Sequence, residues 1–212
     1  MYFPTAPSGV SHKGPKIAKM NHLAHLFLSC GDEDRLLGNF MADYLRPGEY
    51  PQFPPTVQQG IRLHRFIDSF TDTHPLNREA TRILRPYHSK YSPVVIDIYY
   101  DFFLAQNWTR FSEVSLAFFT RTQYQILERR RMDMPPILQR RLPGMIQDDW
   151  LFRQGGEEGI ARTFYFLRKR ASRPELLLHA TRHLYELRSP LESLFLRFFP
   201  LLQAEVNNWC HQ

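Results

Sequence analysis

The chain has 212 residues, of which 43% are hydrophobic and 14% aromatic, so it can bury the core of one sizeable domain. Its net charge of +6 favours an acidic partner, although solubility alone explains such a charge equally well. The two cysteines, Cys30 and Cys210, match no CxxC pattern. This argues against a disulfide framework or a thiolate zinc site and favours a reduced, cytoplasmic setting.

Residues 1–19 contain prolines and glycines but no continuous apolar stretch. We therefore expect a flexible N-terminal extension without a signal peptide, followed by one helical catalytic domain over residues 20–212. No later segment approaches the roughly 18 apolar residues of a membrane span, so we expect no membrane partner.

Apolar residues recur at helical spacing from Asn21 onward, and prolines separate the apolar segments. The stretch 46–55 is rich in proline and is expected to be a loop. No alternating strand pattern and no repeat is present, so we predict an all-α, single-domain helical bundle. Its expected helices are one ending near residue 30, then 34–45, 55–69, 76–87, 92–108 and 112–131, one from 135 interrupted at 143–144, 157–169, and 174–199 with a break near 189–190.

The segment from Gly60 to Pro75 carries the main candidate site. His64 and Asp68 are four residues apart, so a helix places both on one face, within reach of one ion. An imidazole nitrogen with a carboxylate oxygen suits manganese, iron or zinc. Such a pair is also common on solvated helix surfaces.

Three further polar residues lie on apolar segments. These are His25, Asp43 and Asp101, each flanked by hydrophobic side chains. A buried carboxylate must be paired or metal-bound, because an unpaired buried charge costs several kcal/mol, roughly the effective penalty for one ion. A helix cap or an arginine ion pair would satisfy the same requirement. Together with His64 and Asp68, these residues favour a site.

The motifs at 21–26, 37–43, 60–75 and 101–108 resemble those of the acyl carrier protein phosphodiesterase family, and the resemblance spans residue 20 to the C-terminus. That family looks like a divergent branch of the HD-type metal phosphohydrolases, which are all-helical. The resemblance implies removal of 4′-phosphopantetheine from holo acyl carrier protein, with Mn²⁺ as cofactor, in fatty acid biosynthesis and lipid metabolism. It puts His25, Asp43, His64, Asp68 and Asp101 in the metal-site motifs.

We expect Asp43 and Asp68 also to serve catalysis, and Asp72 or His74 to protonate the leaving oxygen. Arg62 and Arg65 are candidate contacts for the anionic phosphodiester, although each is equally well read as a solvated helix residue.

Two positions depart from the family's pattern. His22 stands where an aromatic residue is expected, and Phe102 where a histidine is expected after Asp101. We read His22 as a helix-face residue. The absence of a histidine at 102 leaves Asp101 available as a ligand. It argues against a role for residue 102 as a base or a substrate contact.

Carrier proteins of this type are acidic, so a basic surface would steer them. Candidate docking runs are 129–131, 140–141 and 168–170, which also read as solvated helix ends. One alternative is an HD-type hydrolase of a nucleotide or another small phosphodiester. Another is a helical nucleic-acid-binding module, which we rank last because most aromatic residues fall on core stripes. No nucleic-acid partner is therefore expected.

Overall fold

The computed structural model describes residues 22–46 and 48–211, and within them every regular element is helical. The prediction of an all-α fold is confirmed for this part of the chain. The expected extension over residues 1–19 lies outside the described residues. The α-helices are α1 (His22–Phe27), α2 (Glu33–Met41), α3 (Pro55–Thr73), α4 (Pro75–His88), α5 (Ser92–Gln106), α6 (Leu116–Arg129), α7 (Pro136–Gln147), α8 (Trp150–Arg153), α9 (Glu157–Arg168), α10 (Ala180–Glu186) and α11 (Arg188–Cys210).

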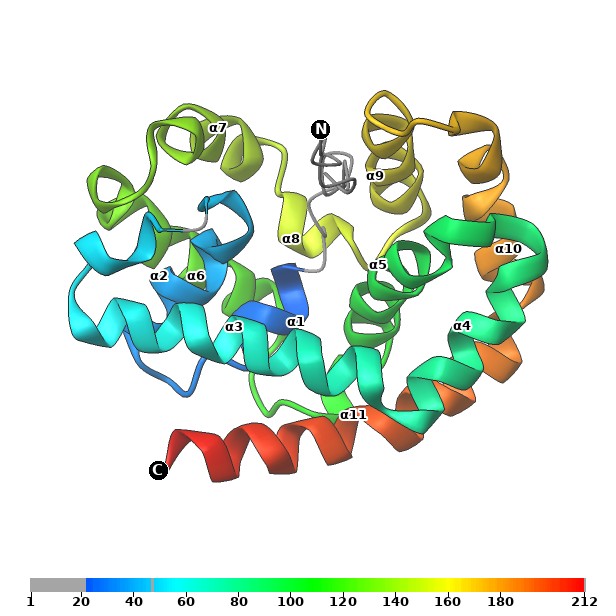
Figure 1. Ribbon diagram of the computed structural model, residues 1–212, viewed down its shortest axis with the longest axis horizontal. Helices are drawn as coiled ribbons and strands as arrows, with labels where there is room; N and C mark the ends of the chain where they lie inside the picture. Colours follow the sequence, from blue (N-terminus) through cyan, green and yellow to red (C-terminus); the bar gives the residue numbers. More distant parts are fainter. Residues whose placement is uncertain (1–21, 47, 212) are drawn as a thin grey trace, which may run out of the picture.

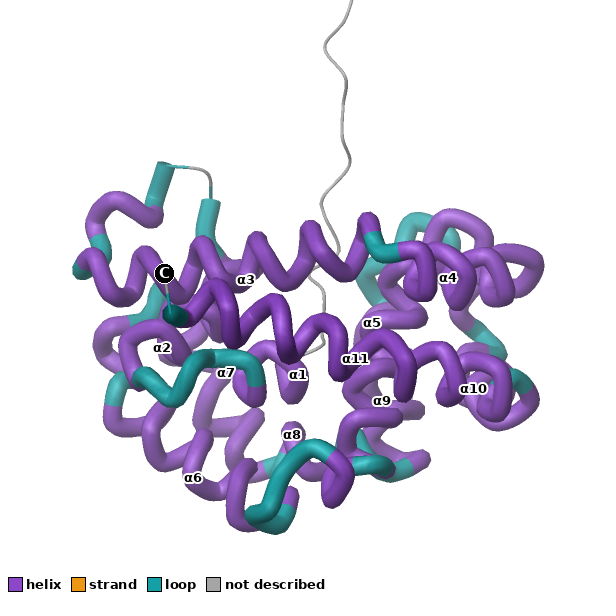
Figure 2. The backbone as a smooth tube through the Cα atoms, turned by 90° about the horizontal axis from the view of Figure 1, so that it is seen from below, coloured by secondary structure: helices purple, strands orange, loops and turns teal. Residues whose placement is uncertain are grey.

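Two long helices, α3 and α11, run along one side of the molecule and join its two ends (Figure 1). Helices α2, α6 and α7 gather at one end, and α4, α5, α9 and α10 at the other. The short helices α1 and α8 lie between these groups, and the view turned by 90° shows the same order (Figure 2). In the described residues, no helix is long and apolar enough to cross a bilayer.

Local sequence explains where several helices begin. The side chain of Asp32 accepts the N–H of Arg35 and caps α2. Ser115 caps α6 in the same way, and Pro75 and Pro93 stand in the first turns of α4 and α5, where a missing N–H costs nothing.

Helices α2 and α3 cross at very close range because each carries a glycine at the contact. A Cβ atom on Gly38 would collide with the carbonyl oxygen of Val57, and one on Gly60 with that of Arg35. This close approach brings the residue after Gly38, Asn39, within hydrogen-bonding distance of His64 on α3. The two glycines therefore serve the geometry of the candidate site.

Several expected boundaries differ from the structure. Helix α3 continues to Thr73, and α7 passes through Pro143 without interruption. The last helix starts at Arg188 and continues past Pro200 to Cys210, because Phe195, Phe198 and Phe199 on it remain buried in the core.

The expectation that the cysteines stay unpaired is wrong in this structure. Cys30 and Cys210 form a disulfide that ties the end of α11 to the loop before α2, with their Cα atoms 5.9 Å apart. The two cysteines are 180 positions apart in sequence, so local spacing gives no sign of the pairing.

Candidate metal centre

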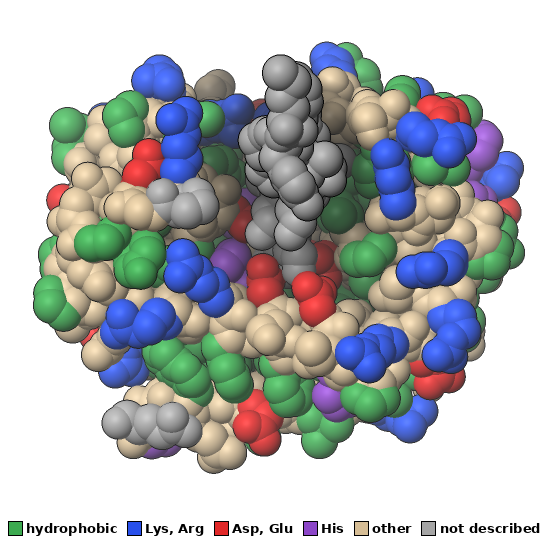
Figure 3. Space-filling view, in the orientation of Figure 1, with side chains coloured by type: hydrophobic (Ala, Val, Ile, Leu, Met, Phe, Trp, Pro, Cys, Tyr) green, Lys and Arg blue, Asp and Glu red, His purple; other side chains and the backbone are tan. Residues whose placement is uncertain are grey.

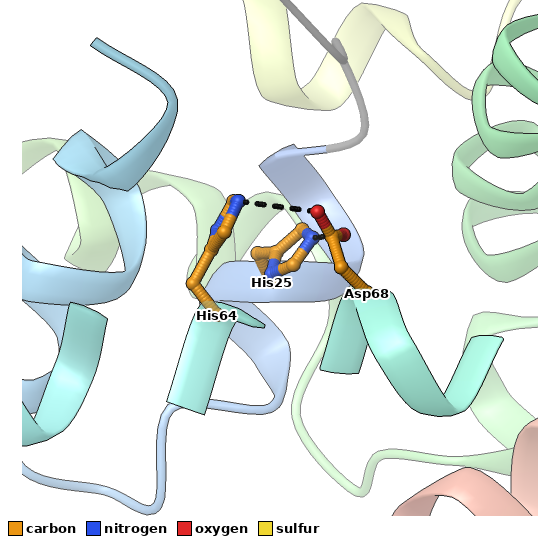
Figure 4. Close-up of side chains that lie close together, drawn as sticks. All are labelled: His25, His64 and Asp68. Atoms are coloured by element: carbon orange, nitrogen blue, oxygen red, sulfur yellow. Dashed lines mark ion pairs between the residues drawn. The ribbon is translucent and has the colours of Figure 1, made fainter. Parts of the chain in front are cut away.

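Two histidines and two aspartates from three separate segments meet at the centre of the molecule. His64 and Asp68 come from α3, His25 from α1, and Asp43 from the 3₁₀ turn Ala42–Tyr44 after α2. Nitrogen and oxygen atoms of His25, His64 and Asp68 lie within 4.8 Å of one another (Figure 4). The structure therefore brings together four of the five residues that the motifs put in the metal site.

The Nε2 atoms of both imidazoles face carboxylates. His25 Nε2 lies 3.4 Å from an oxygen of Asp68, and His64 Nε2 lies 3.4 Å from Asp43 and 3.6 Å from Asp68. The rings of His25 and His64 stack with their centroids 4.1 Å apart. Neither Nε2 atom nor Asp43 Oδ2 has a hydrogen-bond partner, although all three atoms are buried.

Asn39 fixes the orientation of both imidazoles, and the sequence analysis did not single it out. Its Oδ1 lies 2.8 Å from His25 Nδ1 and 3.2 Å from His64 Nδ1, and its backbone carbonyl lies 3.0 Å from His64 Nδ1. Its Nδ2 donates to the carbonyl of His25 and to Ser29 Oγ. The one signal in the sequence is a polar residue one helical turn before Asp43 within an apolar run.

These contacts decide the tautomer of each neutral histidine. Carbonyl and amide oxygens only accept hydrogen bonds, so Nδ1 carries the proton in both rings. Each Nε2 atom then presents a lone pair toward a carboxylate oxygen of Asp43 or Asp68. Two electron-rich atoms that face each other repel unless a proton or a metal ion lies between them.

The pKa shifts in the cluster also favour a positive charge between the imidazoles and the carboxylates. Burial lowers the pKa of His25, and neighbouring His64 adds to that effect. Burial also opposes protonation of His64, but the contacts with Asp43 and Asp68 outweigh it and raise the pKa of His64. Burial opposes ionisation of Asp43 too, yet His64 keeps the pKa of Asp43 below its usual range. The arrangement thus favours a positive charge between the two carboxylates.

The donor set fits a divalent transition metal. Two neutral imidazole nitrogens and two carboxylates are ligands that manganese, iron and zinc accept. Outer contacts such as those of Asn39 are the usual means by which a protein fixes the rings of metal-binding histidines. The residues that would hold the ion are His25, Asp43, His64 and Asp68.

Asp101 has a different place from the one expected. Its carboxylate is fully buried, and its two oxygens accept the N–H groups of Leu23 and Ala24 at 3.0 and 2.9 Å. Burial raises the pKa of Asp101 to about 8, although these N–H groups act in the opposite direction. Asp101 therefore caps the first turn of α1 and positions His25 through that helix. Because both of its oxygens accept these N–H groups, Asp101 is not one of the proposed ligands.

Asp72 and His74 do not join the cluster either. Asp72 is exposed near the end of α3 and lines a separate hollow together with Arg78 and Arg82 of α4. His74 connects α3 to α4, and its Nδ1 accepts the N–H of Leu76 at 3.2 Å. Neither side chain belongs to the group formed by His25, His64 and Asp68, and the proton-donor role expected for Asp72 or His74 stays a prediction.

The candidate substrate arginines lie on the solvent side of α3. Arg62 and Arg65 are both exposed, and the guanidinium of Arg65 lies over the ring of Tyr50, 5.0 Å from its centroid. The structure shows no contact of either arginine with the cluster. Figure 3 shows acidic side chains at the centre of this face, over α3, with Lys and Arg side chains around them.

Two arginines of the first basic run, residues 129–131, form ion pairs. Arg129 pairs with Glu33, and Arg130 with both Asp34 and Asp133. These pairs link the end of α6 to α2, and the docking role expected for this run stays a prediction.

The two departures from the family's motifs have separate explanations. Phe102 is buried in the core and packs edge-on against Phe103, with ring centroids 5.7 Å apart. His22 is also buried and meets the ring of Trp150 edge-on at 4.7 Å. Burial lowers the pKa of His22 to about 3, so this side chain stays neutral as part of an aromatic wall beside the cluster.

The sequence matches known proteins along most of its length. The family model for acyl carrier protein phosphodiesterase matches residues 20–202. The chain is similar to the acyl carrier protein phosphodiesterases of Photorhabdus laumondii (30% identity over 89% of this chain and 96% of the relative) and Yersinia pestis (31% over 89% and 98%). It is also similar to that of an Escherichia coli O139:H28 strain (30% over 89% and 98%). No solved structure matches significantly. The chain belongs to the acyl carrier protein phosphodiesterase family.

Proposed function

We propose that this protein is a metal-dependent phosphodiesterase of the HD type that removes the 4′-phosphopantetheine group from holo acyl carrier protein and leaves the apo form. One observation carries the proposal. The lone pairs of His25 Nε2 and His64 Nε2 face the carboxylates of Asp68 and Asp43 at 3.4 Å, in a chain of this family. Manganese is the cofactor we propose, because the donor set combines nitrogen and carboxylate ligands.

The reaction joins a water oxygen to the phosphorus and breaks the bond from phosphorus to the serine oxygen of the carrier protein, which leaves with a proton. A divalent ion would polarise the phosphoryl oxygens and lower the pKa of a water molecule toward 7. Asn39 holds both imidazoles with Nε2 toward the reaction centre, and Asp101 anchors the helix that bears His25. The chain thus prepares its ligands before any substrate binds.

The basic runs at 140–141 and 168–170 support docking of an acidic carrier protein. Arg141 and Arg170 are exposed, and both line a pocket that includes Tyr44, the residue after Asp43. Positive charge at this rim would steer an acidic partner toward the cluster, and salt would weaken the effect.

The protein's place in the cell remains a prediction. The sequence suggests the cytoplasm, whereas the Cys30–Cys210 disulfide is a bond that a reducing cytoplasm disfavours.

The decisive experiment is to incubate holo acyl carrier protein with the enzyme and manganese and to record the intact mass of the carrier. We expect the mass to fall by one phosphopantetheine group. Asp68→Asn should abolish this change with no loss of helical circular dichroism, since an amide is a poorer ligand than a carboxylate. Asp72→Asn, on the same helix but outside the cluster, should retain turnover.

Each other outcome has a definite meaning. Full activity and metal content in Asp68→Asn would remove Asp68 from the site. Loss of activity in Asp72→Asn would return Asp72 to the proton-donor role that its position in the sequence suggests. Hydrolysis of a nucleotide diester without any effect on holo carrier protein would favour the alternative HD-type hydrolase.

A further inference from the structure

A pocket of about 320 Å³ lies beside the metal centre, between α1, α7, α8 and α9. It begins at His22, one helical turn before His25, and at Tyr44, which follows Asp43. The pocket therefore opens from the place where the phosphodiester would react, and its volume is within the range of small-molecule sites.

The walls of this pocket are apolar and its rim is cationic. Trp150, Met145 and Phe166 supply apolar surface, while Arg141 and Arg153 are exposed at its edge. Among the described residues, neither arginine has an ion-pair partner. Such a lining suits a flexible, largely uncharged chain that carries an anionic group at one end.

One buried polar group in the pocket lacks a partner. Gln154 is 1% exposed and lines the pocket, and its Nε2 donates to Thr163 Oγ1 at 3.2 Å. Its Oε1 accepts no hydrogen bond from any described group. A buried amide oxygen without a donor is costly, so this atom is suited to receive an N–H from a bound molecule.

We propose that this pocket binds the pantetheine arm of the substrate, with Gln154 Oε1 accepting an N–H from one of the arm's amide groups. The inference rests on the proposed function, because it takes the arm as the part of the substrate next to the phosphodiester. The class of ligand is an amide-bearing chain with a phosphate at one end. The site thereby selects the arm, whereas the metal centre acts on the phosphodiester.

Gln154→Leu removes the acceptor but keeps most of the volume. Its matched control is Gln123→Leu on α6, since Gln123 is also buried with an unpartnered Oε1 but does not line the pocket. We would measure the binding of free 4′-phosphopantetheine by calorimetry in the absence of metal. The affinity should fall roughly tenfold in Gln154→Leu, the usual scale for one hydrogen bond left unmade, and stay unchanged in Gln123→Leu.

A second variant guards against misfolding of the first. Gly144 lies on α7 at the pocket wall, and a Cβ atom there meets no described atom within 4 Å. Gly144→Leu should fold, because leucine favours a helix more than glycine does, and it should weaken phosphopantetheine binding by filling the pocket.

The outcomes separate this inference from the proposed function. If the wild-type enzyme releases the arm from holo carrier protein but both pocket variants bind phosphopantetheine as tightly as wild type, the pocket assignment is wrong and the function stands. If phosphopantetheine binds in the pocket but holo carrier protein is never cleaved, the function is wrong and the pocket stands. Equal weakening in Gln123→Leu would also overturn the assignment, since that variant leaves the pocket untouched.

Discussion

Replacing Asn39 by alanine tests how the protein organises its metal ligands. In the wild type, His25 Nδ1 has the Asn39 side chain as its acceptor at 2.8 Å, whereas His64 Nδ1 also contacts the Asn39 backbone carbonyl at 3.0 Å. Asn39→Ala therefore orphans the Nδ1–H of His25 but not that of His64. The carbonyl of His25 keeps its hydrogen bond from Ser29 Oγ.

The loss of this one hydrogen bond sets the expected changes in stability and in metal affinity. One buried donor left unpaired costs about 1–3 kcal/mol of folding free energy. Loss of a contact that orients a metal-binding histidine typically lowers metal affinity or activity by roughly 10- to 100-fold. We expect Asn39→Ala to weaken Mn²⁺ binding within that range, and turnover of holo carrier protein with it.

Isothermal titration of Mn²⁺ into the purified variant measures this loss, and urea denaturation reports its stability. Ser29→Ala is the matched control, because Ser29 contacts Asn39 Nδ2 and the His25 carbonyl but neither imidazole ring. It should lose stability with little change in metal affinity. A folded Asn39→Ala protein that binds Mn²⁺ as tightly as wild type would refute the role given to Asn39.

Three other predictions follow from contacts outside the ligand set. Asp101→Asn should lower the free energy of unfolding by about 1 kcal/mol, the usual cost of a lost helix cap. The Mn²⁺ affinity should stay close to wild type. A complete loss of metal binding would show that Asp101 is a ligand. Cys210→Ser should destabilise the oxidised protein toward urea by about 2–4 kcal/mol, and thiol titration of denatured wild type should find Cys30 and Cys210 oxidised; two free thiols would contradict the pairing. His88 is fully buried, and its Nδ1 lies within hydrogen-bonding distance of the Leu176 carbonyl. Burial lowers the pKa of His88, so at acidic pH the unfolded chain binds a proton at this residue that the folded chain does not bind. Stability should therefore fall as the pH drops below about 6.5, and the fall should be smaller in His88→Phe; an equal fall would exclude His88 as its source.

The sequence predicts the helical architecture and most of the site because both depend on local spacing. An interval of four residues places His64 and Asp68 on one face of α3, whatever the rest of the fold does. Apolar surroundings around His25 and Asp43 indicated buried polar groups that needed partners, and the structure brings both to α3.

Local spacing and apolar surroundings could not distinguish a metal-binding aspartate from one that caps a helix. Asp101 carries the burial signal of Asp43, but its oxygens meet the N–H groups of α1, some 77 residues away in sequence. Only the packing of α5 against α1 decides between the two roles. Gln154 shows the same limit, because its unpartnered oxygen is a property of the assembled pocket and leaves no mark in the sequence.

The most direct test of the metal centre is an anomalous difference map from crystals of the protein soaked in Mn²⁺. We predict a peak within bonding distance of His25 Nε2, His64 Nε2 and carboxylate oxygens of Asp43 and Asp68, and its absence in Asp68→Asn crystals treated in the same way. A wild-type map without a peak between these four side chains, or with manganese bound only elsewhere, would contradict the metal site on which the proposed function rests.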